Sequence, residues 1–248
     1  MVPLCARMGR RGAFGTANEF GMRKSIALAF GLLIACVAAQ GADLSPLAVE
    51  WINSQARIRS WSASFVQTRT LPSLVQPLTA TGQVHFVAPG RFRWELGQPP
   101  QTIAVRATND LWLVYPRLKR AERYALDGAA RSSWQAALQL LEAGFPRSQA
   151  EVEAQYGVLS ESRTNGTCQL ALQPRASSAR KVISKIRVEF NASDLQLRAT
   201  EFEFADGSRM RNDFAGQALN PDLDEALFVP DIPPDFKIVT PANRSKHP

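Results

Sequence analysis

Apolar and polar residues alternate with a period of two along most of the chain, a pattern typical of strands that bury one face. Residues 91–96 show it most clearly, because Phe92, Trp94 and Leu96 alternate with arginine and glutamate. Similar segments occur at 62–68, 82–86, 103–105, 111–115, 157–163, 168–173, 181–190, 195–204 and 208–214. The pattern predicts about ten or eleven strands in an antiparallel sheet, joined mainly by short turns such as the one at 165–166.

Three shorter segments have helical spacing instead. Ser45 can cap a helix that starts at Pro46, since proline is favoured in the first helical turn. A second helix is expected at 132–143, and Ser148 can cap a short third helix over residues 149–155. The first two have an apolar face each, so we expect these two helices to lie on the sheet.

One antiparallel sheet of this size must curl. If it curls without closing, it leaves a concave apolar face that the helices can cover. The segment 228–241 contains four prolines and is expected to wrap around the sheet as an extended arm instead of joining its centre. No change of composition marks a linker, so residues 43–241 are expected to form one mainly β domain with a helical lid, followed by a flexible tail at 242–248.

The first 42 residues have the pattern of a secretory signal peptide, with basic residues before an apolar run at 26–39. This run is shorter than the roughly 20 residues that a membrane span requires. Met22, followed by two basic residues, would make a normal start, so we interpret residues 1–21 as an upstream extension.

The signal peptide can end at either of two sites. The string AQG, ending at Gly41, fits cleavage that releases a soluble periplasmic protein. The string LIAC, ending at Cys36, fits the box of bacterial lipoproteins, in which the cysteine is lipidated and anchors the protein to a membrane. Both alternatives stay open.

More than half of the net positive charge of the chain lies in this leader. The whole chain has 29 Lys and Arg against 22 Asp and Glu, a formal net charge of +7. Without residues 1–42 the net charge falls to +3, because the leader holds five basic residues and one acidic residue. The remaining basic residues form no run typical of nucleic-acid binding, so no nucleic-acid partner is expected.

Residues that carry catalysis or bind metals are scarce. Only two histidines, His85 and His247, and three cysteines are present. Two of the cysteines lie in the leader, which leaves too few of these residues for their usual four-ligand metal site. We interpret Cys168 as a packed thiol. Glu201 and Glu203 leave a hydrolase open as an alternative, although carboxylates at this spacing on a strand usually share a solvated face. We therefore expect no enzyme, no metal and no cofactor.

Aromatic residues gather on strands that we expect to be neighbours. An apolar concavity that two short helices cannot fill is a site for an apolar ligand. The predicted lining consists of Phe65, Val84, Phe86, Phe92, Trp94, Leu96 and Trp112 on the strands, and of Trp134, Leu138 and Leu141 on the helix at 132–143.

Three strings carry a family resemblance: ASFVQ at 63–67, GQVHFVAPGRFRWE at 82–95 and DLWLVYP at 110–116. The string LFVP at 227–230 adds to it. In order and spacing they resemble the LolA family of periplasmic outer-membrane lipoprotein carriers. The resemblance covers most of residues 44–240 and is densest in 61–124.

The resemblance implies an unclosed, eleven-stranded antiparallel half barrel with helices as a lid. It also implies a monomeric carrier that takes lipoproteins from an inner-membrane release complex, shields their acyl chains and passes them to an outer-membrane acceptor. Phe92 matches the family's strand phenylalanine, whose ring lies in the cavity.

One position departs from the family pattern. The family's well-known carrier has an arginine, which holds the lid closed, directly before the proline that matches Pro89; this chain has Ala88. Arg91 and Arg93 are therefore the candidate lid latches. The departure leaves open a carrier for another lipid or an aryl-polyene-type product, an anchored acceptor like LolB, and a lipid- or lipoprotein-sensing regulator resembling the N-terminal part of RseB.

Overall fold

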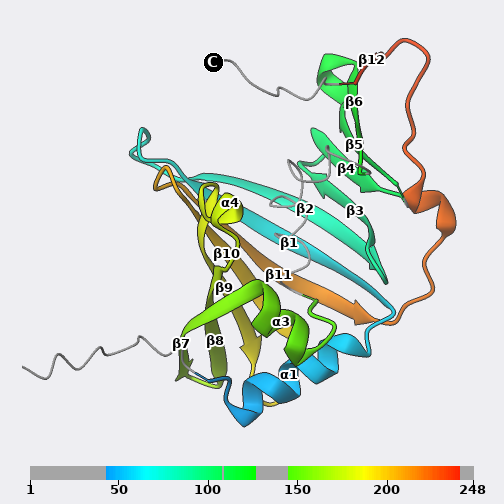
Figure 1. Ribbon diagram of the computed structural model, residues 1–248. Coiled ribbons are helices and arrows are strands. Elements are labelled where there is room, and N and C mark those ends of the chain that lie inside the picture. The colour runs from blue at the N-terminus through cyan, green and yellow to red at the C-terminus, as the bar shows by residue number, and fades with distance from the viewer. Residues whose placement is uncertain (1–42, 108, 127–144, 241–248) are drawn as a thin grey trace, which may run out of the picture. The chain divides into compact units, whose positions relative to one another are not determined.

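One twelve-stranded sheet organises the part of the protein that the computed structural model describes, residues 43–107, 109–126 and 145–240 (Figure 1). The strands are β1 Ser60–Thr70, β2 Leu78–Val87, β3 Arg91–Leu96, β4 Thr102–Arg106, β5 Asp110–Tyr115, β6 Arg120–Ala125, β7 Tyr156–Thr164, β8 Thr167–Pro174, β9 Ile183–Asn191, β10 Leu197–Phe204, β11 Arg209–Leu219 and β12 Lys237–Val239. Their order is β12-β6-β5-β4-β3-β2-β1-β11-β10-β9-β8-β7, so the sheet has two edges and is not closed. The predicted fold class is confirmed.

The strand count and pairing differ from the expectation in one respect. Eleven strands pair antiparallel, but β12 pairs parallel with β6, with Ile238 opposite Ala121. The C-terminal arm, residues 220–240, runs outside the sheet through the 3₁₀ helix η2 Glu225–Phe228 before it reaches β12 (Figure 1). The arm therefore wraps as predicted and also supplies an edge strand, which the sequence did not predict.

Two predicted helices are confirmed, α1 Pro46–Ala56 and α3 Gln149–Gln155. The hydroxyl of Ser45 accepts from the amide of Ala48 at 3.2 Å, and that of Ser148 accepts from the amide of Glu151 at 3.1 Å. These bonds satisfy backbone donors that a helix start leaves unpaired. The short α4 Ser177–Arg180 and the 3₁₀ helix η1 Pro116–Leu118 complete the described helices, and the predicted helix at 132–143 lies outside the described residues.

The core lies between α1 and one face of the sheet. Trp51 on α1 stacks on Phe190 of β9 with ring centroids 4.9 Å apart, and both side chains are almost fully buried. We call this side of the sheet, which also carries the buried Phe65, Phe92 and Phe202, the inner face. Among the described residues, no helix has the length and apolar character required to cross a membrane.

Gly82 fixes how β1, β2 and β3 pack. It pairs with Phe65 on one side and Leu96 on the other. A Cβ atom added at Gly82 would lie 2.3 Å from Cζ of Phe65 and 2.3 Å from the carbonyl oxygen of Glu95. The phenyl ring therefore occupies the space that a side chain at this position would need, and only glycine permits the contact.

We predict that Gly82→Ala lowers the free energy of unfolding by about 1–3 kcal/mol, because the added methyl overpacks the core. Gly157→Ala is the matched control, since its added Cβ would come no closer than 4.0 Å to another residue. Its stability should be unchanged or about 0.4–1 kcal/mol higher. Urea denaturation of both variants measures the difference, and equal stabilities would contradict the assigned role of Gly82.

Candidate functional site

A cavity of about 630 Å³ opens on the inner face of the sheet. Its volume falls within the range of roughly 300–1,000 Å³ that is typical of small-molecule sites. Seven strands and Phe145 contribute to the lining, which consists of Trp61, Gln67, Arg69, Val84, Phe86, Phe92, Trp94, Ala104, Leu113, Phe145, Leu197, Thr200, Phe202, Met210, Asn212 and Phe214.

The register of the strands explains why these residues meet. Trp94 of β3 pairs with Ala104 of β4, which in turn pairs with Leu113 of β5. Directly opposed residues of antiparallel strands lie on the same face, so the three form one row across the sheet. The small alanine between two larger side chains helps to leave the row hollow.

Aromatic contacts build the wall of the cavity. The ring centroid of Phe65 lies 4.2 Å from that of Trp94, and Trp94 meets Phe214 edge-on at 6.3 Å. Phe145 stacks on Phe86 at 4.6 Å and meets Trp61 edge-on at 4.9 Å. Such pairs contribute about 0.5–1.5 kcal/mol each beyond their buried area. The wall is thus held by contacts between strands that are far apart in sequence.

The sequence located part of this lining. Four predicted residues line the cavity: Val84, Phe86, Phe92 and Trp94. Phe65 is buried behind Trp94, and Leu96 packs against the core on the same face, but neither lines the cavity. The predicted residues Trp134, Leu138 and Leu141 lie outside the described residues.

The prediction that Trp112 lines the cavity is wrong, because Trp112 lies on the outer face of the sheet. It pairs with Val105 and Arg123, and the guanidinium of Arg123 lies 5.6 Å from the centroid of its ring. The next residue, Leu113, lines the cavity, and successive side chains on a strand point to opposite faces. Trp112 therefore cannot line it.

Arg91 and Arg93, the predicted lid latches, hold the C-terminal arm instead. They alternate with Phe92 and therefore point to the outer face. There Arg91 forms an ion pair with Glu225, with one N···O distance of 3.0 Å. Arg93 donates to the carbonyl of Leu227 at 3.3 Å. Both contacts fasten the arm against β3.

Phe145 and Arg147 are cavity-side residues that the sequence reasoning missed. The guanidinium of Arg147 lies 5.5 Å from the ring centroid of Phe86, and Nη1 donates to the carbonyl of Ile58 at 3.2 Å. Arg147 thus helps to hold the segment that places Phe145 over Trp61 and Phe86. Phe145 is an apolar residue just after the predicted helix end, and this was the sequence signal that could have placed it in the lining.

Polar side chains form one row in the otherwise apolar lining. Nε2 of Gln67 donates to Oδ1 of Asn212 at 3.0 Å, and Nδ2 of Asn212 donates to Oγ1 of Thr200 at 3.3 Å. We call these three residues, on β1, β11 and β10, the polar row; all three are buried. Arg69 follows two residues beyond Gln67 on the same face of β1 and is exposed at the end of the cavity.

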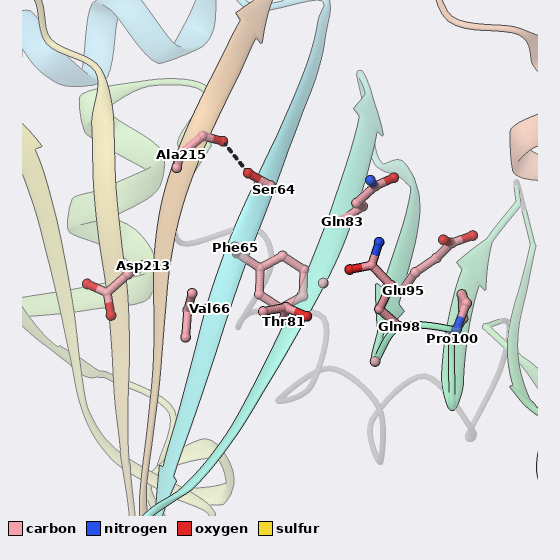
Figure 2. Close-up of a pocket in the computed structure, with 12 residues that line it drawn as sticks. Ser64, Phe65, Val66, Thr81, Gln83, Glu95, Gln98, Pro100, Asp213 and Ala215 are labelled. Atoms are coloured by element: carbon pink, nitrogen blue, oxygen red, sulfur yellow. Dashed lines mark hydrogen bonds between the residues drawn. The ribbon is translucent and has the colours of Figure 1, made fainter.

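A second pocket, of about 360 Å³, involves the outer-face side chains of β1, β2 and β11 (Figure 2). Figure 2 shows Ser64 donating to the carbonyl of Ala215, a contact of 3.0 Å. Its carboxylates, Glu95 and Asp213, already form ion pairs with Arg93 and Arg211. The inner cavity is therefore the stronger candidate for a ligand site.

The two carboxylates that the sequence offered for catalysis already have charged partners. Glu201 and Glu203 both form ion pairs with Arg187, so the pair suggested as a hydrolase alternative is a charged patch on the outer face. Burial lowers the pKa of His85, which favours its neutral form. The described residues contain no group of three or more His, Cys, Asp or Glu that could hold a metal.

An unclosed sheet with a hollow apolar inner face has the architecture of a container for hydrophobic ligands. The chain belongs to the LolA family, since the model of the outer membrane lipoprotein carrier protein LolA matches residues 56–231. This is a family of periplasmic carriers, not of enzymes.

Individual proteins of known name or structure are similar to this chain. The outer-membrane lipoprotein carrier protein of Leptothrix cholodnii is 28% identical over 197 residues, which cover 77% of this chain and 85% of the relative. A solved LolA superfamily protein from Nitrosomonas europaea is 14% identical and has a TM-score of 0.39, with 73% of this chain and 97% of that chain covered. A chain in the solved MucA/MucB complex of Pseudomonas aeruginosa is 15% identical and has a TM-score of 0.38, with 78% of this chain and 64% of that chain covered.

We predict that Cys168 does not react in the folded protein. Its side chain is fully buried, and Sγ lies 3.4 Å from a carboxylate oxygen of Glu161. Burial, together with this contact, raises the pKa of the thiol to about 11, so the reactive thiolate is scarce at pH 8. Iodoacetamide followed by mass spectrometry should modify the peptide containing Cys168 only after unfolding in urea, and rapid labelling of the native protein would contradict the prediction.

Proposed function

We propose that this protein is a periplasmic carrier that holds the acyl chains of lipoproteins, or of a related lipid, in the inner cavity. The observation that carries the proposal is the cavity of about 630 Å³, lined by aromatic and aliphatic side chains from seven strands. Family membership supports a lipoprotein cargo. In this proposal the carrier receives its cargo from an inner-membrane release complex and delivers it to an outer-membrane acceptor.

The physical need for such a carrier comes from the acyl chain. Removing one methylene group from water contributes about 0.8 kcal/mol, so a free acyl chain does not cross an aqueous compartment unaided. A carrier must shield the chain and still release it. Delivery then depends on the difference between its affinity and that of the acceptor.

Residues 1–42 are part of the proposal, as the signal peptide that takes the protein across the inner membrane, and residues 43–241 are the binding domain. Cleavage at the end of this segment would release a soluble monomer. Lipidation of Cys36 would instead give a membrane-anchored acceptor with the same cavity. Mass spectrometry of the mature N-terminus, on protein expressed from the full chain, separates the two.

The cavity assignment predicts stoichiometric binding of one acyl chain. We expect Leu113→Glu to weaken binding of a fluorescent fatty acid by at least about tenfold, because a charge in the apolar row disfavours hydrocarbon beside it. Leu113→Met is the matched control, since it keeps volume and polarity, and its affinity should stay within about threefold. Titration of the purified protein measures all three affinities.

A second variant keeps this test independent of charge and folding. Ala104→Phe would fill the row between Trp94 and Leu113 and should shorten the longest alkyl chain that binds. Urea denaturation checks that each variant is folded. Unchanged binding by folded Leu113→Glu and Ala104→Phe would overturn the cavity as the acyl site. Acyl lipids or lipoproteins that co-purify from the periplasm, identified by mass spectrometry, would identify the cargo.

A further inference from the structure

The inner face of β1 changes its chemistry along the strand. Trp61 lines the cavity, Gln67 belongs to the polar row, and Arg69 ends the series. We call the part of the cavity that is lined by Trp61, Phe86, Phe92, Trp94 and Phe214 the aromatic section. On β11, Asn212 and Met210 are the direct partners of Gln67 and Arg69. The cavity therefore has an aromatic section and a polar end, and a ligand with two chemically different parts would match both.

The polar row is only partly engaged within the protein. Gln67 donates to Asn212, and Asn212 donates to Thr200, which here acts as an acceptor. Within the described residues, the hydroxyl of Thr200 donates to no other group. Buried hydroxyl groups normally use their donor, and this one lines the cavity. The row can thus offer a hydrogen bond to a ligand oxygen.

Arg69 supplies the charge at the same end. Its partner in β11 is Met210, which carries no charge. In the described part of the chain, no carboxylate lies within ion-pair distance of its guanidinium. The nearby carboxylate of Asp206 accepts hydrogen bonds from Ser208, which are the main cause of its lowered pKa, and the charge of Arg69 adds to them only weakly. The guanidinium is therefore available to an anion at the end of the cavity.

The geometry points to a head-group subsite formed by Arg69 and the polar row, and we propose that it binds the anionic head of an amphiphile whose acyl chain lies in the aromatic section. Arg69 lies two residues, about 6.6 Å, beyond Gln67 along β1, and Thr200 lies two strands, about 9.6 Å, across the sheet from Gln67. A head group whose charge lies at Arg69 can therefore place a second, separated oxygen at the polar row. Arginine binds both anions through charge-assisted, bidentate hydrogen bonds. The inference rests on the proposed acyl binding and adds the orientation and head-group class of the ligand.

Three probes of equal chain length separate the head from the tail: hexadecanoic acid, hexadecyl phosphate and hexadecanol. We expect Arg69→Gln to weaken both anionic probes by about tenfold, the typical loss for a hydrogen bond to a charged group, and to leave hexadecanol unchanged. A larger loss for one anion than for the other would identify which head the subsite prefers. Competition against a fluorescent fatty acid, at one salt concentration, measures the affinities.

Arg209→Gln is the matched control. Arg209 lies directly before Met210 on β11, so its side chain points to the outer face at the same end of the sheet, and the variant removes the same charge. All three probes should bind this variant within about twofold of the unmodified protein. An equal loss in Arg69→Gln and Arg209→Gln would indicate long-range attraction and overturn the subsite.

Thr200→Val tests the polar row separately, since it removes the hydroxyl at nearly constant volume. We expect a loss of about two- to fivefold for probes whose head reaches the row, and no loss for hexadecane, a fourth probe that has no head group. If Arg69→Gln weakens hexadecanol as much as the anions, the head-group subsite is wrong while acyl binding stands. If none of the probes binds the unmodified protein, the proposed function itself fails.

Discussion

The pairing of β1 with β11 is the constraint on which the rest of the structure depends. Its ladder runs from Trp61 opposite Leu219 to Thr70 opposite Arg209, joining residues about 140–160 positions apart in the chain. On one side of it lie β2 to β6 and β12, and on the other lie β7 to β10. Because the cavity takes its lining from both sides, it exists only when this ladder forms.

The outer face is organised by a different force. Near β9, β10 and β11 it carries a network of ion pairs, in which Arg211 contacts Glu189 at 2.7 Å and Asp213 at 2.8 Å. Over β3 to β6 the C-terminal arm covers it, with Phe228 buried and Phe236 beside Val105 and Val114. One sheet thus has a solvated half and a covered half on the same face. This explains why β4 and β5, in the covered half, carry apolar residues on both faces.

This difference also explains how much of the structure could be predicted from the sequence. Residues 91–96 alternate strictly, and β3 has the predicted bounds. In β5, all residues from Leu111 to Tyr115 are apolar or aromatic, because its outer face lies under the arm. The alternation of a strand predicts that Trp112 and Leu113 face opposite sides of the sheet. It does not predict which of the two faces inward, because both are apolar. The misassignment of Trp112 follows from this ambiguity.

The role of Arg91 and Arg93 and the edge strand β12 were not predicted, for other reasons. The alternation that placed Phe92 inward already placed Arg91 and Arg93 outward, so a lid contact for them conflicted with the pattern itself. Strand β12 has only three residues and follows a proline-rich segment, and its pairing with β6 depends on the path of the arm. No local pattern in Lys237–Val239 carries that information.

The polar row shows what an open sheet adds to a simple apolar container. A lining made only of aromatic and aliphatic groups would bind any hydrocarbon of suitable length, with an affinity set by buried area. Placing Gln67, Asn212 and Thr200 in the cavity reduces that area and requires mutual hydrogen bonds to offset their desolvation. A ligand without a polar group opposite the row leaves the Thr200 donor unsatisfied. The row therefore lowers affinity for plain hydrocarbon more than for an amphiphile, and specificity arises from the difference.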